Sequence, residues 1–356
     1  AARLARAGAE VLLLERGPAR NGRIMAFPAG YMKYLAREDY LVMHATEPQE
    51  TLDGRGPIVP QAKVLGGGGA VNAMVYMRGR RGDYDGWNAA VTQPGGTPDV
   101  AWDWDSLLPH YVAQEINDHL GGPAHGTSGP MTVSHLGHVS EMSRAWVKTM
   151  QNAGIRYTPD FNGGDIRGVG FMQHTIDWRT RRRCSPAEAF LGPVRDLPNL
   201  DIVTGATVAG LEFEGERVTG VRYDAGEGIQ TASAGEVILT AGTYQTPKLL
   251  MLAGIGPEAE LAGHDIACRV NRPGVGANLQ DHYECPVVAR TNGAYGYFGQ
   301  DKGWRVLVNG LRYLLTRSGP VTTTGVETCA FLDLTGRGGD PAIQMFCVPT
   351  VYLDRD

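Results

Sequence analysis

Four consecutive glycines, residues 66–69, form the stretch of this sequence with the clearest chemical use. A backbone without Cβ atoms can adopt positive φ and lie close to a planar ligand. Residues 70–77 then read as a helix with Asn72 on its first turn, and N–H groups at such a turn can bind a phosphate or a ring carbonyl. A flexible loop that contacts no ligand has the same composition, so the glycine run alone leaves both interpretations open.

A carboxylate stands at the end of the first apolar run. Residues 11–14 are continuously apolar, as in a buried parallel strand, and Glu15 follows them. A dinucleotide-binding βαβ unit places an acidic residue there to bond the ribose, after a strand and a glycine loop about 20 residues upstream. A position about 20 residues before Glu15 would lie before Ala1, so the sequence does not contain this glycine loop. Glu15 is therefore an ordinary strand-end carboxylate or part of a Rossmann unit entered after its first strand, and the helical pattern over 1–7 favours the second.

A second strand end carries small residues. Residues 236–242 read as a buried strand that closes with Ala241 and Gly242, before a helix over 248–253 with Thr246 as N-cap and Pro247 at N1. Such an ending lets a planar ring approach the backbone at the carboxyl edge of a parallel sheet. A tight βα loop without a ligand fits the same residues.

Two clusters of basic and imidazole side chains read as structural. His135 and His138 have a spacing that suits a metal ion on a helix, but Gly137 lies between them and no third ligand is near. We therefore expect a loop pair and no metal site. The arginine-rich run 179–183 reads as a solvated face, with contact to an anionic cofactor as the second interpretation.

Bulk composition excludes several classes of protein. The 356 residues carry a net charge of −5 without a dominant basic tract, which argues against a nucleic-acid partner. No apolar run approaches the ~18 residues of a membrane span. The five cysteines are scattered and never spaced C-x-x-C, which argues against a disulfide framework or zinc site and fits a reducing compartment. We expect a cytoplasmic protein, with peripheral membrane association left open.

The remaining pattern predicts a mixed α/β fold. Gly8 should end the first helix, and two-residue alternation predicts an antiparallel meander over 208–213, 218–223 and 230–232. Ser185 and Glu188 have the spacing of a capping box at a helix start. Composition shifts beyond Pro286, so we place one region at 1–290 and a second at 291–356.

Several stretches match one family in a single order. The chain resembles the glucose–methanol–choline flavin oxidoreductases, on the branch of the bacterial alcohol and choline dehydrogenases. The glycine-rich stretch and the stretch after Ala241 are specific patterns of this family, and the resemblance covers nearly the whole chain. The residues that carry it are 11–15, 62–72, Tyr76, Arg78, Gly79, Tyr84, Asp85, Trp87, 125–130, 160–163, 242–257 and 273–282.

The resemblance implies an FAD-binding, Rossmann-like domain that lacks its first strand and phosphate-binding glycine loop, followed by an incomplete substrate-binding domain. Glu15 would bond the adenosine ribose, and Val208 would meet the adenine. Glu327 would lie near the substrate, as in some choline-type members. The other residues that would line the cofactor are Gly66, Gly67, Gly68, Gly69, Asn72, Met74, Ala241 and Gly242.

The departures from the family pattern set further expectations. Val71 matches the position where some relatives tether FAD through a histidine, so we expect non-covalent FAD. The catalytic histidine of the family has no counterpart here and is expected beyond Asp356, so we expect an internal fragment that is inactive alone.

The implied reaction is hydride transfer from an alcohol to the flavin, with the electron acceptor undetermined. A flavin-containing cyanohydrin lyase of the same family, a non-catalytic FAD-binding protein and an NAD(P) enzyme using Glu15 remain alternatives.

Overall fold

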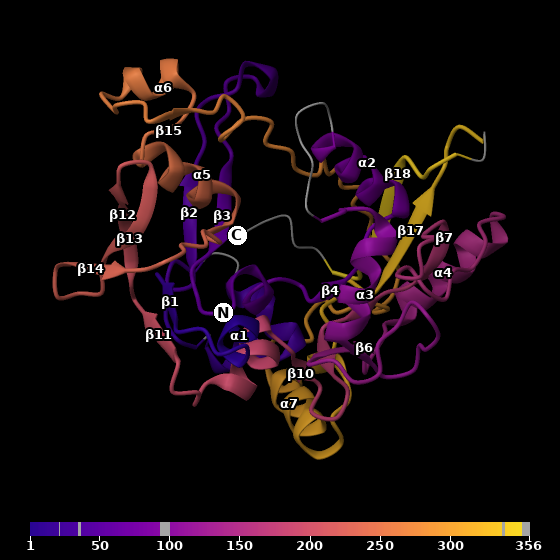
Figure 1. The fold of residues 1–356 in the computed structure, drawn as a ribbon. Helices are drawn as coiled ribbons and strands as arrows, with labels where there is room; N and C mark the ends of the chain where they lie inside the picture. Colours follow the sequence, from indigo (N-terminus) through magenta and orange to yellow (C-terminus); the bar gives the residue numbers. More distant parts are fainter. Residues whose placement is uncertain (21, 35–36, 93–99, 337–338, 351–356) are drawn as a thin grey trace. The chain divides into compact units, whose positions relative to one another are not determined.

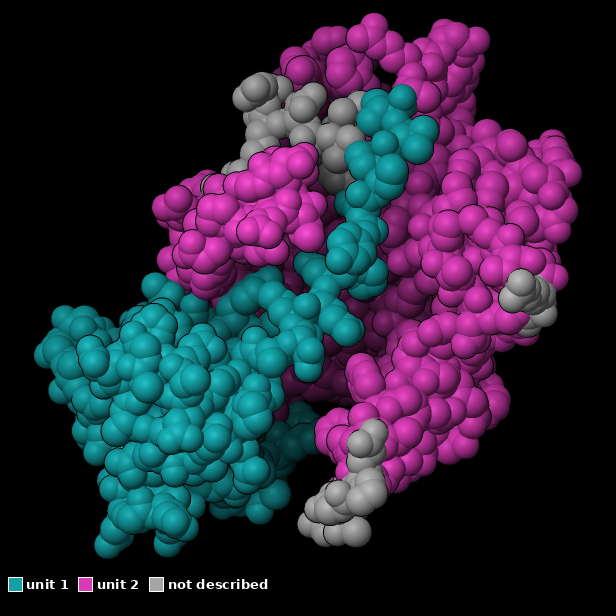
Figure 2. Space-filling model, turned by 90° about the horizontal axis from the view of Figure 1, so that it is seen from above, with its two compact units in different colours: residues 1, 3–19, 198–288 teal, residues 2, 20–197, 289–356 magenta. Residues whose placement is uncertain are grey.

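The computed structural model describes residues 1–20, 22–34, 37–92, 100–336 and 339–350. The chain divides into two compact units (Figures 1 and 2): unit 1 comprises residues 1, 3–19 and 198–288, and unit 2 comprises residues 2, 20–197 and 289–356. Both units combine helices with short strands, so the mixed α/β prediction is confirmed. The assignment of 1–290 to cofactor binding and 291–356 to a substrate-binding domain stays a prediction.

The parallel strand pair of unit 1 follows the predicted start of the chain. Helix α1 (Ala2–Arg6) is followed by Gly8 with φ of +90°, and β1 (Val11–Glu15) pairs in parallel with β11 (Leu200–Thr204). Full burial of this run was a wrong prediction, since Leu12 is 41% exposed. The reason is that β11 is the one strand paired with β1 in the part of the chain that the structure describes.

The meander of unit 1 is confirmed, whereas the strand predicted after it is not. Strands β12 (Thr207–Glu214), β13 (Arg217–Asp224) and β14 (Ile229–Ser233) pair antiparallel. Residues 236–241 belong to no strand among the described elements, and Ile238 is 59% exposed, because no described strand pairs with residues 236–240.

Helix α5 (Gly242–Leu252) starts earlier than predicted, with Pro247 inside it rather than at N1. Unit 1 also contains α6 (Glu258–Gly263) and a short parallel pair, β15 (Ile255–Gly256) with β16 (Val270–Asn271).

Two sheets organise unit 2 (Figure 1). One has the order β5-β6-β8-β4 and the other the order β18-β17-β7. The bounds of these strands are β4 Val75–Tyr76, β5 Glu115–Asn117, β6 Met131–His135, β7 Gly168–Phe171, β8 Gln173–His174, β17 Thr328–Leu332 and β18 Ile343–Cys347. Met172 alone separates β7 from β8, so the chain passes directly from one sheet to the other. Met172 is buried against Phe161 and Cys329, which fixes this crossing point.

Helices and small turns complete unit 2. Helix α4 (Glu141–Asn152) packs on β7 and β17 through Val147, Val169 and Ala330. No helix among the described residues has the length and apolar character to cross a membrane. The other elements are η1 Arg23–Ala26, η2 Pro28–Tyr34, β2 Leu41–Ala45, η3 Glu50–Leu52, β3 Ile58–Ala62, η4 Gly67–Ala70, α2 Arg81–Val91, α3 Trp104–Gln114, β9 Ile176–Asp177, β10 Arg182–Arg183, η5 Ala187–Leu191, η6 Gly192–Val194, α7 Trp304–Thr316 and η7 Pro320–Thr322.

Candidate functional site

The four glycines form a turn with one packed side and one open side. Gly66 and Gly67 have φ of +96° and +58°, in the left-handed region that favours glycine. A Cβ atom on Gly66 would lie 3.0 Å from Cβ of Ala187, and one on Gly69 would lie 2.5 Å from the ring of Pro186. A Cβ on Gly67 or Gly68 would meet open space. Packing therefore requires glycine at positions 66 and 69, whereas Gly67 and Gly68 expose bare backbone.

The helix predicted over 70–77 is wrong, because the chain makes only the short turn η4 before entering β4. Met74, with φ of +61° and a fully buried side chain, ends the predicted helical segment. The Asn72 side chain stabilises this reversal: its Oδ1 accepts a hydrogen bond from the N–H of Met74 at 3.0 Å. The amide that we expected to face a ligand thus holds the turn itself.

Arg183 is the central support of the turn, contrary to the solvated face predicted for the arginine run. Its guanidinium is buried and donates to the carbonyl oxygens of Gly69 (3.1 Å), Asn72 (2.7 Å) and Met25 (3.1 Å), and to Oδ1 of Asn72 (3.0 Å). Burial lowers the pKa of Arg183 to about 10, so the group stays charged at neutral pH. The neighbouring Arg182 is exposed, as predicted.

The residues that pack under the turn are held by the predicted capping box. Oγ of Ser185 accepts from the N–H of Glu188 at 3.2 Å, and Oε2 of Glu188 accepts from the N–H of Ser185 at 3.1 Å. This reciprocal pair starts the helical segment at Pro186 and so positions Pro186 and Ala187 against the glycines.

Unit 1 holds the other predicted cofactor residues. Glu15 ends β1, and its Oε1 accepts from the N–H of Gly17 at 2.7 Å. The backbone carbonyl of Glu15 accepts from Ala206 at 2.9 Å, which brings Glu15 close to Val208 on β12. Ala241 and Gly242 are exposed at the start of α5, and Gly242 has φ of +85°. The expected convergence of Gly242 with the glycine turn of unit 2 stays a prediction.

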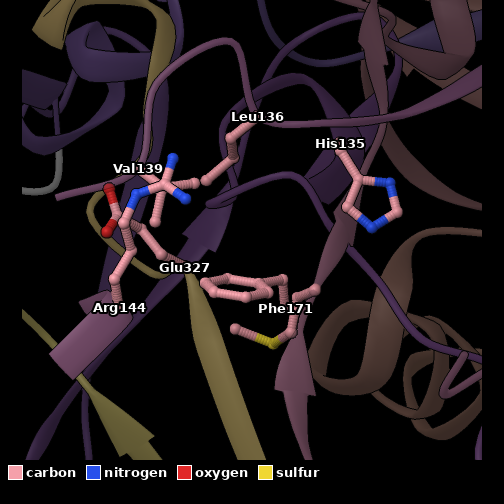
Figure 3. Close-up of a pocket in the computed structure, with 7 residues that line it drawn as sticks. His135, Leu136, Val139, Arg144, Phe171 and Glu327 are labelled. Carbon is pink, nitrogen blue, oxygen red and sulfur yellow. The ribbon is translucent and has the colours of Figure 1, made fainter. Parts of the chain in front are cut away.

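Glu327 lies at a pocket of about 190 Å³ within unit 2 (Figure 3). Glu327 directly precedes β17, and its side chain is fully buried. In Figure 3 the carboxylate of Glu327 lies beside Arg144, while the imidazole of His135 stands apart from them. The lining residues are His135, Leu136, Val139, Arg144, Phe171, Met172 and Glu327.

Both oxygens of Glu327 are bonded to the protein. Oε2 accepts from the N–H (3.0 Å) and the Oγ (2.9 Å) of Ser140, and Oε1 accepts from Oγ1 of Thr323 (2.7 Å) and from the hydroxyl of Tyr297.

Tyr297 and His135 have shifted pKa values. Burial and the nearby Glu327 charge raise the pKa of Tyr297 well above its usual range. Burial, together with His119, lowers the pKa of His135 to about 4, so this wall of the pocket is uncharged at neutral pH.

A second buried polar cluster joins three family stretches that the sequence left without a role. The guanidinium of Arg78 donates to Oε2 of Glu115, and both side chains are fully buried. The His125 ring bridges Oε1 of Glu115 through Nδ1 and Oδ2 of Asp160 through Nε2, each at 3.0 Å. The N–H of Arg78 donates to Oδ1 of Asn162 at 2.9 Å. These residues form a structural network, and nothing in the sequence indicated Glu115 as its centre.

The network predicts a stability that depends on pH. Burial alone would lower the pKa of His125, but hydrogen bonds to Asp160 and Glu115 outweigh it and raise the pKa to about 9. Because the folded pKa lies above the ~6.5 of an unfolded histidine, this contribution is complete below about pH 6.5 and is lost as pH rises through about 9. Between about pH 6.5 and 9.5, urea unfolding should show a larger decrease in the free energy of unfolding for the wild type than for His125→Gln. Equal decreases would show that His125 is not the group whose titration changes the stability.

Comparison with known proteins identifies the family of the chain. The model of the GMC oxidoreductase family matches residues 20–284. The chain is 35% identical to "Alcohol dehydrogenase [acceptor]" of Pseudomonas putida, over 97% of this chain and 62% of that protein. It is 33% identical to an oxygen-dependent choline dehydrogenase of Brucella anthropi, over 95% of this chain and 60% of that one.

Solved structures give the same result. The crystal structure of pyridoxine 4-oxidase from Mesorbium loti has a TM-score of 0.81 at 29% identity, covering 98% of this chain and 63% of that one. A formate oxidase of Aspergillus oryzae has a TM-score of 0.83 at 25% identity, covering 99% and 66%. The chain thus spans about three fifths of the length of the curated relatives above. Since the family model covers most of its residues, the chain belongs to the GMC oxidoreductase family.

Proposed function

We propose that this chain supplies the FAD-binding part and one substrate-pocket wall of an enzyme that oxidises an alcohol to an aldehyde or ketone. The observation that carries the proposal is the braced glycine turn, whose Gly67 and Gly68 present backbone to open space. The names of the relatives, which act on alcohols with different acceptors, support the reaction class and leave the electron acceptor open.

The residues present fit a flat, anionic cofactor. Cβ atoms at Gly67 and Gly68 would fill space that is now free, so a ring or pyrophosphate could approach the N–H groups directly. In the proposal the backbone groups of Gly66, Gly67, Gly68, Gly69, Asn72 and Met74 hold the pyrophosphate and flavin side. Glu15 and Val208 serve the adenosine, and Ala241 and Gly242 form a further backbone contact. Bound FAD would accept the hydride; these residues bind and orient it.

The first test is retention of flavin. The purified 356-residue chain is incubated with FAD, excess is removed by gel filtration, and the visible spectrum of the protein is recorded. We expect one FAD per chain, and a colourless protein would contradict the proposal. Reduction of the bound flavin by alcohols is tested without oxygen on the protein encoded by the complete gene, because the chain spans only about three fifths of its curated relatives.

We expect the FAD to be bound without a covalent link. By the family resemblance, Val71 matches the position of the linking histidine in some relatives, and an aliphatic side chain cannot form the bond. Acid precipitation of the loaded protein should therefore leave all flavin in the supernatant. A pellet that stays yellow after washing with denaturant would show that another residue forms the link.

Glu327 is proposed to favour substrates that carry a positive charge near the reacting hydroxyl. Glu327 lines the pocket, and its carboxylate oxygens are held by Ser140, Thr323 and Tyr297. Glu327→Gln removes the charge at nearly constant volume, and we expect KM for a cationic alcohol such as choline to rise about tenfold, equivalent to ~1.4 kcal/mol. KM for a neutral alcohol of similar size should change less than about twofold. Kinetics of the full-length enzyme measure both.

Glu141→Gln is the matched control, because Glu141 is an exposed carboxylate on α4 of the same unit. Circular dichroism should confirm that both variants fold. An equal rise in KM for cationic and neutral alcohols would assign Glu327 a purely structural role.

A further inference from the structure

Three side chains that sequence reasoning did not connect meet at the end of β6. The ligand atoms of Asp118, His119 and His135 all lie within 4.8 Å of one another. The rings of His119 and His135 have centroids 3.9 Å apart with an interplanar angle of 54°. Nδ1 of His119 lies 2.5 Å from Oδ1 of Asp118. The sequence suggested only His138 as a second ligand beside His135, and we discounted that pair; the structure brings His119 and Asp118 to His135.

The strand register explains why these residues meet. Strands β5 and β6 are parallel, with Asn117 opposite Val133. Two residues further on, the same spacing places His119 opposite His135. Beyond the strand, the N–H of Asp118 donates to the carbonyl of Val133 at 3.1 Å and extends the ladder. The cluster is therefore a product of the sheet and is not a chance contact between mobile loops.

His135 has a ring nitrogen without a hydrogen-bond partner among the described residues. This atom, Nδ1, is buried. A buried polar nitrogen without a partner is costly and calls for an explanation, such as an ion that the ring binds. Arg181 donates to the backbone carbonyl of His135 at 3.0 Å and holds the end of β6 in position.

We propose that Asp118, His119 and His135 bind a divalent transition-metal ion, with Zn²⁺ as the best match. Two imidazoles and a carboxylate are ligands that suit Zn²⁺, Co²⁺ and Ni²⁺, whereas Ca²⁺ and Mg²⁺ need more oxygen ligands. Three protein ligands leave the fourth tetrahedral position for water.

Coordination requires the ligand atoms to move, because they are gathered only within 4.8 Å of one another. Ligand atoms of a tetrahedral zinc site are about 3.3 Å apart for bonds of ~2.0 Å, so the 2.5 Å contact of Asp118 and His119 must open. His119 is nearly half exposed and has room to rotate. Because His135 also lines the pocket of Glu327, a bound ion would fix one pocket wall.

The test measures metal binding by the untagged chain after treatment with EDTA, with cysteines kept reduced. Zn²⁺ affinity is determined by competition with a chromophoric chelator, and the coordination sphere by the absorption spectrum of the Co²⁺ form. We expect one ion per chain and a tetrahedral Co²⁺ spectrum without a sulfur-to-metal band. His119→Ala and Asp118→Asn should each weaken Zn²⁺ binding about tenfold or more.

His110→Ala is the matched control, because His110 is an exposed histidine of the same unit outside the cluster. It should bind Zn²⁺ as the wild type does. A melting curve gives an independent readout: Zn²⁺ should raise the Tm of the wild type and of His110→Ala, and should leave the Tm of His119→Ala unchanged. Wild-type affinity in both His119→Ala and Asp118→Asn, or no uptake of metal by the wild type, would overturn the proposal.

Discussion

Arg183→Met is expected to destabilise unit 2 by about 2–4 kcal/mol and to abolish FAD retention. The substitution keeps an unbranched side chain but leaves four oxygen acceptors, on Met25, Gly69 and Asn72, without their shared donor. Hydrogen bonds from a charged donor contribute about 1.5–3 kcal/mol each, while removing one buried cation returns part of that loss. The loss of four bonds should outweigh the relief.

Arg182→Met provides the matched control for this result. Arg182 precedes Arg183 in the same short strand and is exposed. Its replacement should change the free energy of unfolding by less than about 0.5 kcal/mol and leave FAD binding intact. Urea unfolding and the flavin content after gel filtration are measured for both variants. Equal behaviour of the two would show that Arg183 does not hold the glycine turn.

Glu115→Gln is expected to cost about 3–5 kcal/mol of stability, the largest effect of a single polar substitution in unit 2. Glu115 is fully buried and accepts from Arg78, from His125 at 3.0 Å and from Nδ2 of Asn117 at 2.5 Å. Glutamine has nearly the same volume, yet it leaves the buried guanidinium without its counter-charge and turns an N–H group toward other donors. The measurement is the free energy of unfolding in urea at neutral pH.

Asp105→Asn removes a carboxylate from an exposed ion pair, in contrast to the buried pair of Glu115 and Arg78. Its two oxygens are each 2.8 Å from the guanidinium of Arg81, but both side chains are more than half exposed. Solvent screens an exposed pair so strongly that it contributes little to stability, and this variant should therefore unfold close to the wild type. A loss as large as that of Glu115→Gln would mean that burial does not govern the energy of these pairs.

Elements set by neighbouring residues could be predicted from the sequence. Gly8 ends its helix because only glycine adopts φ near +90° without strain, and the Ser185–Glu188 capping box needs contacts only three residues apart. The meander of β12–β14 has short turns and period-two alternation, so its pairing is also local. The family assignment was equally accessible, because it rests on the order of several short stretches.

Features that depend on distant partners could not be predicted in this way. Residues 236–241 have the composition of a strand, but a strand exists only where another strand pairs with it. Arg183 resembles its exposed neighbours in sequence and differs from them because the glycine turn, more than 100 residues earlier, supplies the acceptors for its charge.

By itself, then, the sequence determined the family, the glycine turn as a candidate site and the local helix ends and turns, since these depend on backbone preferences and short-range hydrogen bonds. Tertiary structure alone decided which polar side chains are buried and with whom: Arg183 under the turn, Glu115 between Arg78 and His125, and His135 beside His119. The physical reason is that a buried charge or imidazole is tolerated only where partners from distant segments meet it, and the fold, not the local pattern, brings those segments together.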